Sequence, residues 1–162
     1  MASKNKPITL RRQVIIIRAK RYLSQVHRLR RQIRALEEQI EFLTNKAQGV
    51  KAIEYKADKV DASPADTFAE VMVELAETTN RFSEKVLAYT KTVALITDQI
   101  GSMDNDLHAE LLTLRYLQTD KRGKRFTLFW IAREMHMSED RVKHLHLEAL
   151  AAFQKKYLAE EG

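Results

Sequence analysis

The sequence predicts an all-α protein, in which a long antiparallel helical hairpin, built as a coiled coil, precedes a C-terminal helix-turn-helix domain. Apolar residues recur in alternating steps of three and four along residues 19–47 and again along residues 68–103, a heptad pattern typical of paired helices. Residues 111–153 instead combine short helical patterns with a turn, as a helix-turn-helix does. We therefore divide the chain into a disordered lead at residues 1–7, a helical oligomerisation domain at residues 8–103 and a helix-turn-helix domain at residues 104–162.

The composition restricts the class of protein. A chain of 162 residues with 44% hydrophobic residues is long enough to bury a core. The absence of cysteine rules out disulfides and thiolate chemistry. The one strongly apolar run, Val14 to Ile17, is far shorter than the roughly 20 residues that a membrane-spanning helix needs. We expect a soluble, unsecreted protein of the cytoplasm with no membrane partner.

Charge is unevenly distributed along the chain. Residues 1–62 hold 15 Lys and Arg against 6 Asp and Glu, residues 63–103 hold 3 against 6, and residues 104–162 hold 10 against 10. Between Lys4 and Arg34 there are 11 basic residues and no acidic residue. This segment would attract a polyanion through counterion release, and the alternative is a solvated helix face that only keeps the protein soluble.

The first predicted helix has a seam of β-branched residues and leucines. Such residues at alternate seam positions are favoured in two-stranded coiled coils. The seam residues are Val26, Leu29, Ile33, Leu36, Ile40 and Leu43. Gln48 and Gly49 predict the end of this helix, and residues 50–62 predict a loop because they show no sustained period.

The second predicted helix begins at Ser63-Pro64. Ser63 can cap a helix, Pro64 suits the first helical position, and Asp66 suits the positive end of the helix dipole. Its apolar stripe consists of Phe68, Met72, Leu75, Thr79, Phe82, Val86, Tyr89, Val93, Ile96, Ile100 and Met103.

Two helices of matched length predict a hairpin, and paired hairpins form four-helix bundles. We therefore expect a homo-oligomer, with a dimer favoured. The residues expected to hold it together are Val26, Leu29, Ile33, Leu36, Ile40, Leu43, Leu75, Phe82, Val86, Val93 and Ile96.

A cluster of helix-breaking residues separates the hairpin from the C-terminal domain. Gly101 and residues 104–106 mark this break, and Asp106 is the expected cap of a helix at Leu107–Leu117. The loop from Gln118 to Phe126 that follows is rich in cations, namely Lys121, Arg122, Lys124 and Arg125. In a helix-turn-helix this loop would lie near DNA phosphates, although an exposed loop is often basic simply because loops are polar.

The helix-turn-helix itself is predicted from a short helix at Leu128–Met135 and a second helix after Ser138. The first helix has an inward stripe of Leu128, Ile131, Ala132 and Met135. His136 falls at a turn position where the backbone needs a left-handed conformation. Ser138 is a good N-cap. Val142, Leu145 and Leu150 give the second helix its apolar stripe.

The second helix offers polar side chains off its apolar stripe. Arg141, Lys143 and His144 have the donors that read guanine or bind phosphate. Glu139 and Asp140 could accept from cytosine, but an acidic pair at a helix start equally well complements the helix dipole. Both interpretations stay open for these two residues.

The pattern resembles the region-4 helix-turn-helix of bacterial sigma factors. The match rests on Leu111, Leu114 to Leu117, Thr127, Ile131-Ala132, Met137-Ser138, Val142 and Ala149-Leu150. From Tyr22 onward the chain also resembles small phage transcriptional regulators of the ArpU and RinA type, whose signature includes the LRYL block and the run His146 to Leu150. The resemblance implies a phage late-gene activator that acts at promoter DNA in the host cytoplasm and contacts RNA polymerase.

The residues expected to contact double-stranded DNA, from the resemblance and the loop charge together, are Lys121, Lys124, Arg125, Thr127, Ser138, Glu139, Asp140, Arg141, Lys143 and His144. The chain departs from the family pattern at Phe129 and Trp130, where polar residues are usual. These two aromatic residues should point away from the helix-turn-helix core. They therefore predict a contact surface, either for the chain's own hairpin, which we favour, or for another protein such as polymerase.

The sequence gives little sign of catalysis. Its histidines lack metal-ligand spacing, since His144 and His146 point to different faces of one helix, and its glycines form no phosphate-binding loop. We expect no enzyme activity, no metal and no cofactor. Two alternative functions remain, a small terminase-like component of phage DNA packaging and a coiled-coil adaptor that binds RNA polymerase through a sigma-like head.

Overall fold

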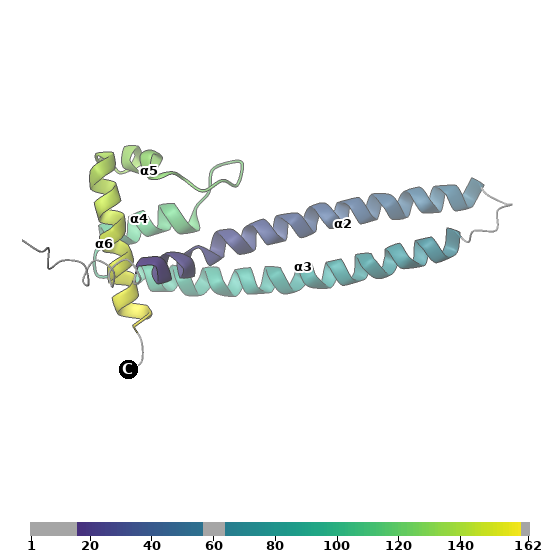
Figure 1. The fold of residues 1–162 in the computed structure, drawn as a ribbon, viewed down its shortest axis with the longest axis horizontal. Coiled ribbons are helices and arrows are strands. Elements are labelled where there is room, and N and C mark those ends of the chain that lie inside the picture. The colour runs from purple at the N-terminus through teal and green to yellow at the C-terminus, as the bar shows by residue number, and fades with distance from the viewer. Residues whose placement is uncertain (1–15, 57–63, 160–162) are drawn as a thin grey trace, which may run out of the picture. The chain divides into compact units, whose positions relative to one another are not determined.

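The computed structural model describes residues 16–56 and 64–159, and the regular secondary structure within them is helical, which confirms the predicted all-α class. Residues 16–23 are helical and lead through a turn at Ser24 into the first long helix. The elements in chain order (Figure 1) are α2 (Gln25–Lys56), α3 (Pro64–Gly101), α4 (Asp106–Leu112), the π-helical segment η1 (Thr113–Leu117), α5 (Leu128–Glu134) and α6 (Glu139–Tyr157). No helix among these residues is long and apolar enough to cross a membrane.

The chain forms two compact units. Leu29–Thr90 make up one unit, and the chain before and after this range makes up the other, which we call the head unit. The predicted domain boundary after residue 103 coincides with neither junction between the units. The predicted lead at residues 1–7 and the predicted cap Ser63 lie outside the described residues.

In the unit formed by residues 29–90, α2 and α3 pack against each other side by side (Figure 1). Leu43 and Ala47 of α2 form a buried cluster with Val71 of α3, and Phe68 and Leu75 pack against that cluster. Farther back along α2, Arg30 Nη2 donates a 2.8 Å hydrogen bond to the hydroxyl of Tyr89. Earlier residues of α2 therefore contact later residues of α3, so the two helices run in opposite directions within this unit.

The predicted end of the first helix at Gln48-Gly49 is wrong, because α2 continues to Lys56. Gly49 is an exposed helical position where an added Cβ would meet nothing within 4 Å. A glycine inside a helix costs only about 1 kcal/mol relative to alanine. The neighbouring turns, which bury Ala47 against α3, evidently offset that cost. Residues 50–56 are thus helical rather than part of a loop, and residues 57–63 are not described.

The predicted stripe on α3 is also wrong at two positions. Met72 and Thr79 are exposed, whereas Val71 and Thr78 are buried, with 3% and 0% of their surface exposed. Both choices are compatible with steps of three and four, so the spacing alone does not distinguish them. Thr78 can be buried because its hydroxyl donates to the carbonyl oxygen of Glu74 at 2.8 Å, which satisfies the polar group inside the helix.

The predicted seam is partly used within the single chain. Val26, Leu43 and Ile96 are fully buried without a second copy. The other predicted seam residues are half-buried, namely Leu29, Ile33, Leu36, Ile40, Leu75, Phe82, Val86 and Val93. Their role in oligomerisation stays a prediction, but α2 and α3 already cover much of this surface in one chain.

The head unit has its own closed core. α4 and α5 pack against α6, and the large side chains that are completely buried there include Leu111, Leu112, Tyr116, Ile131, Val142, Leu150 and Phe153. The helical segment before α2 and the end of α3 belong to the same unit. Tyr22 places its ring 5.8 Å from that of Phe153 and donates a 3.0 Å hydrogen bond to Oε1 of Gln99.

The helix after the break begins one residue earlier than predicted, and Asn105 rather than Asp106 caps it. Asn105 has an extended backbone, and its side-chain oxygen accepts from the backbone nitrogens of Leu107 and His108 at 2.9 and 3.2 Å. Asn and Asp cap helices equally well, so the backbone conformation decided between the two neighbours. Asp106 occupies the first turn instead, where its charge favours the helix dipole.

Candidate nucleic-acid interface

The centre of the candidate interface is the corner between α5 and α6. Ile131 and Ala132 of α5 and Val142 and Leu145 of α6 are buried as predicted and hold the corner together. The backbone nitrogen of Met137 donates to the carbonyl oxygen of Ala132 at 2.9 Å, which closes the turn. The end of α5 and the first turns of α6 are thus held at the corner by packing and by a backbone hydrogen bond.

His136 lies in the turn with a φ of 55°, the left-handed conformation predicted from the sequence. Asn, Asp and His tolerate this region better than β-branched residues do. The side chain is exposed. The geometry of the turn therefore accounts for the backbone conformation of His136.

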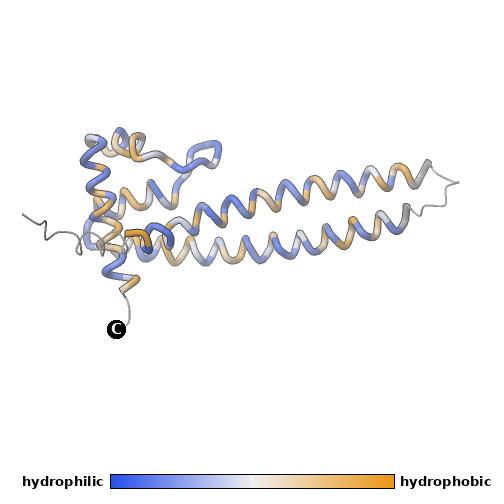
Figure 2. The backbone as a smooth tube through the Cα atoms, in the orientation of Figure 1, coloured by the Kyte–Doolittle hydropathy of each residue, from blue (hydrophilic) through white to orange (hydrophobic). Residues whose placement is uncertain are grey.

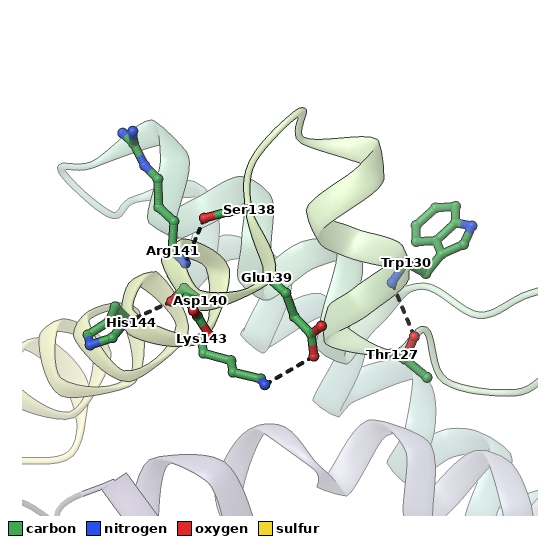
Figure 3. Close-up of polar contacts among 8 residues, drawn as sticks. All are labelled: Thr127, Trp130, Ser138, Glu139, Asp140, Arg141, Lys143 and His144. Carbon is green, nitrogen blue, oxygen red and sulfur yellow. Dashed lines mark hydrogen bonds and ion pairs between the residues drawn. The ribbon is translucent and has the colours of Figure 1, made fainter.

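The start of α6 is set by a side-chain cap, as predicted. Ser138 has an extended backbone, and its hydroxyl accepts a hydrogen bond from the backbone nitrogen of Arg141 at 3.2 Å (Figure 3). Glu139 and Asp140 follow in the first turn, where negative charge complements the helix dipole. The Ser138 hydroxyl accepts in this cap and keeps its own O–H to donate, so its DNA contact stays a prediction.

Arg141, Lys143 and His144 all lie on the exposed surface of the first turns of α6. Lys143 Nζ makes a 3.0 Å ion pair with Glu139, and Nδ1 of His144 hydrogen-bonds to the carbonyl oxygen of Asp140 at 2.8 Å (Figure 3). The Arg141 guanidinium extends away from these residues (Figure 3). Arg141 is therefore the side chain of this group most ready to take a new partner.

The basic loop before α5 is a tight turn organised by Asp120, a residue that the sequence analysis did not single out. Its carboxylate accepts from the backbone nitrogens of Arg122 and Lys124, both at 2.8 Å. Gly123 adopts a φ of 76°, and Thr119 pairs with Arg125 in an isolated β-bridge. The signal available in the sequence was an Asp shortly before a Gly, a pattern typical of turns.

The loop presents some of its predicted cations and retains another. Lys121, Arg122 and Lys124 are exposed at the turn. Arg125 instead points inward, with its guanidinium 5.4 Å from the centre of the Tyr116 ring and an Nη2 donating to the hydroxyl of Ser24 at 3.2 Å. Arg125 is thus engaged within the head unit, and its predicted phosphate contact would require it to leave these partners.

Thr127 is the N-cap of α5. Its hydroxyl accepts from the backbone nitrogen of Trp130 at 3.2 Å (Figure 3), and its side chain lies at the exposed surface. Helix capping therefore accounts for a threonine at position 127. A DNA contact by the same hydroxyl stays a prediction.

A buried polar pair behind the corner was missed by the sequence analysis. The hydroxyl of Tyr116 and Nε2 of His146 lie 2.8 Å apart, with both residues buried. Burial raises the pKa of Tyr116 to about 12, despite the opposing effect of Arg115 and Arg125. Burial, together with the positive charges of Arg115, Lys20 and Arg125, lowers the pKa of His146 to about 4. His146 is therefore neutral at physiological pH.

Arg115 is the half-buried cation beside this pair. Burial lowers its pKa, and the neighbouring Tyr116 acts in the opposite direction. Its Nη1 donates to the carbonyl oxygen of Phe126, so it ties the π-helical segment η1 to the end of the basic loop. Nε2 of His27 lies 3.1 Å from the carbonyl oxygen of Arg115. These contacts hold the loop and α5 in place.

Phe129 and Trp130 point outward from the core, as predicted, with 56% and 37% of their surface exposed. Trp130 stacks on Phe126 with ring centroids 3.8 Å apart. Phe129, Trp130, Arg133 and Glu134 line an open surface groove on α5. The sequence analysis had considered a contact with the hairpin or with another protein, and it had not considered the stacking on Phe126.

No cluster of three or more metal-ligating side chains occurs in residues 16–56 and 64–159. Comparison of the chain with models of protein families, with curated proteins and with solved structures finds no match.

Proposed function

We propose that this protein binds double-stranded DNA with α6 as its recognition helix and regulates transcription at specific sites. The observation that carries the proposal is the exposed, capped start of α6, where Arg141 extends outward beside Lys143 and His144. A helix of this kind fits the major groove, and its first turns reach the base edges.

The basic loop supports this proposal from the other side of α5. Lys121, Arg122 and Lys124 are exposed on a turn whose shape is fixed by Asp120 and Gly123. Cations on a preformed loop bind phosphates without a large ordering cost. Lys143 would have to loosen its pair with Glu139, but an exposed pair of this type contributes only about 0.3–0.5 kcal/mol. DNA binding can readily overcome that loss.

We interpret α2 and α3 as an antiparallel coiled-coil hairpin and α5 with α6 as a sigma-like helix-turn-helix. On this interpretation the protein is a phage-type transcriptional regulator of the bacterial cytoplasm, and the hairpin brings two recognition helices to one DNA site. Paired half-sites one helical turn apart are the usual target of such dimers.

A second candidate is a contact between the head and another protein, such as RNA polymerase. The observation that favours it is the outward pair Phe129 and Trp130 beside Arg133 and Glu134. Apolar side chains with neighbouring charges are typical of protein contact surfaces. The two candidates are compatible, because α5 presents this surface away from the start of α6 (Figure 3).

To test the proposal, the full-length protein is used to select binding sites from a pool of random duplex DNA. Its affinity for the selected site is then measured. Arg141→Ala should weaken specific binding by about 1–3 kcal/mol, because a bidentate hydrogen-bond contact with a base contributes about that much to specific binding. Lys155→Ala is the matched control, since Lys155 is an exposed cation in the last turn of the same helix. It should change affinity little.

Non-specific binding provides a further readout. Arg141→Ala should relax the sequence preference at one base position, whereas Lys121→Ala should weaken binding to all sequences and reduce the salt dependence. Unchanged affinity and unchanged site preference in the Arg141→Ala, Lys143→Ala double variant would show that α6 does not read DNA.

A further inference from the structure

A second stripe of residues runs along the exposed surface of α3 within the unit formed by residues 29–90. Its members recur in alternating steps of four and three, carry no charge and are all exposed. They are Ala69, Val73, Ala76, Asn80, Ser83, Leu87 and Thr90. Val73 and Leu87 leave 59% and 56% of their surface exposed. A heptad repeat of uncharged residues is the pattern with which one helix packs against another.

This stripe is distinct from the surface that α2 covers. The residues of α3 that pack against α2 include Phe68, Val71 and Leu75. Val73 is two positions beyond Val71, which corresponds to about 200° around the helix. Hydrophobic residues accordingly recur along α3 among hydrophilic ones (Figure 2). The helix therefore has an apolar surface that its own chain leaves uncovered.

The charges of the same unit are segregated along its helices. Residues 35–53 and 66–80 together hold seven acidic and two basic residues, whereas residues 29–34 and 81–90 hold five basic residues and one acidic residue. The contact between Arg30 and Tyr89 places the two basic ranges side by side. The cluster around Leu43 and Val71 does the same for the two acidic ranges. One part of the unit is thus acidic and the other basic.

We propose that this stripe is the interface with a second copy of the chain, and that the two α3 helices pack antiparallel. An antiparallel arrangement places the acidic part of one unit beside the basic part of the other. A parallel arrangement would align like charges, which repel. The charge pattern therefore indicates that the partner is a second copy of the chain and that the two α3 helices are antiparallel. This proposal does not rest on DNA binding.

The polar residues Asn80 and Ser83 at the middle of the stripe indicate its register. If the twofold axis passes between Asn80 and Ser83, then Leu87 faces Ala76 of the second copy, and Val73 faces Thr90 of the second copy. Asn80 and Ser83 then face each other across the axis and can hydrogen-bond. Leu87 then meets the smaller Ala76, and Val73 meets Thr90, which has a similar size, so the helix axes can lie about 8–10 Å apart.

Cross-linking of cysteine variants tests direction and register, because the natural chain contains no cysteine. A mixture of full-length Val73→Cys and Thr90→Cys should form a mixed disulfide dimer on mild oxidation, since disulfides require Cα atoms within about 7 Å. Each variant alone should not cross-link. Glu74→Cys mixed with Thr90→Cys is the matched control, because Glu74 is exposed and lies off the stripe.

Sedimentation over a range of concentrations tests the interface itself. Leu87→Glu should weaken dimerisation of the full chain by at least about tenfold, because it puts a charge at a desolvated helix contact. Its helical content should be unchanged, since Leu87 is exposed in the single chain. Phe42→Glu is the matched control on α2, where the side chain is 64% exposed.

Four results would overturn the proposal. The full chain could prove monomeric at high concentration, or Leu87→Glu could leave dimerisation unchanged. Phe42→Glu could weaken dimerisation as strongly as Leu87→Glu, which would mean that another surface makes the contact. Finally, Val73→Cys alone could cross-link as readily as the mixture, which would indicate parallel helices.

Discussion

The head unit and the unit formed by residues 29–90 differ in how completely they bury their apolar side chains. In the head, short helices cross one another, and side chains such as Leu150 and Phe153 are completely buried. In the other unit two long helices lie side by side, and seam residues such as Ile33, Leu36 and Ile40 stay half-buried. Two helices alone cannot enclose a core, because each covers only one side of the other.

The difference indicates where each unit gets its stability. The head has a core that its own chain closes, so it can hold α6 rigidly. The two-helix unit keeps apolar surface exposed on Phe42, Val73 and Leu87, so it gains most from a second copy. Association with a second copy would then make the stability of this unit depend on protein concentration.

The largest expected effect is the difference between matched leucines in the two units. Leu150→Ala should destabilise the protein by about 3–5 kcal/mol, because it leaves a cavity in a closed core. Leu36→Ala should cost about 1–2 kcal/mol at low protein concentration, because its side chain is only half-buried. Urea unfolding followed by helical circular dichroism measures both. Equal costs at every concentration would remove the distinction between the two units.

The next effect concerns pH and the buried His146 of the head. Its pKa is lowered from 6.5 to about 4 by burial and by the nearby Arg115, Lys20 and Arg125. Below pH 6.5 the imidazole of His146 is protonated in the unfolded chain but stays neutral in the folded head. The free energy of unfolding therefore falls as the pH drops from 6.5 toward 4. The loss from this residue is at most about 3 kcal/mol.

Measuring unfolding at pH 7 and pH 4.5 isolates this contribution if a His146→Gln variant is compared with the natural chain. The variant removes the titrating group while leaving a polar partner for Tyr116. Its stability should fall less over the same pH interval. The same fall in both proteins would assign the pH dependence to carboxyl groups instead.

Glycines in the two units should respond in opposite directions to the same substitution. Gly123→Ala in the basic loop should cost about 1–2 kcal/mol, because its φ of 76° strains any residue with a Cβ. Gly49→Ala in α2 should stabilise by about 0.5–1 kcal/mol, since the added Cβ meets nothing within 4 Å. Thermal unfolding compares the two directly. A destabilising Gly49→Ala would argue that α2 does not continue through this position.

A smaller effect than that of the core leucine is expected at Trp130, which lies outside the core of the head. Trp130→Ala should cost about 0.5–1.5 kcal/mol through the lost stacking on Phe126. Amide exchange in α5 should rise while exchange in residues 29–90 stays unchanged. Faster exchange in both units would mean that Trp130 also affects the unit formed by residues 29–90, and no change in either would mean that the residue is tolerated surface.

The sequence by itself determined the local elements of this protein. Heptad spacing predicted the long helices, and the cap Ser138, the turn at His136 and the inward stripe of Ile131 and Ala132 were all predicted correctly. These features depend on residues within one or two turns of each other, where spacing and capping chemistry decide the outcome. The exposed polar face of α6 followed from the same spacing.

Only the tertiary structure decided which of several locally acceptable choices was used. Val71 and Thr78 rather than Met72 and Thr79 face α2, α2 runs through Gly49, and Arg125 turns inward toward Tyr116. The buried pair of Tyr116 and His146 joins residues 30 positions apart in the sequence. The physical reason is that burial and long-range partners contribute free energies as large as the local preferences, and these partners are specified only when distant segments meet.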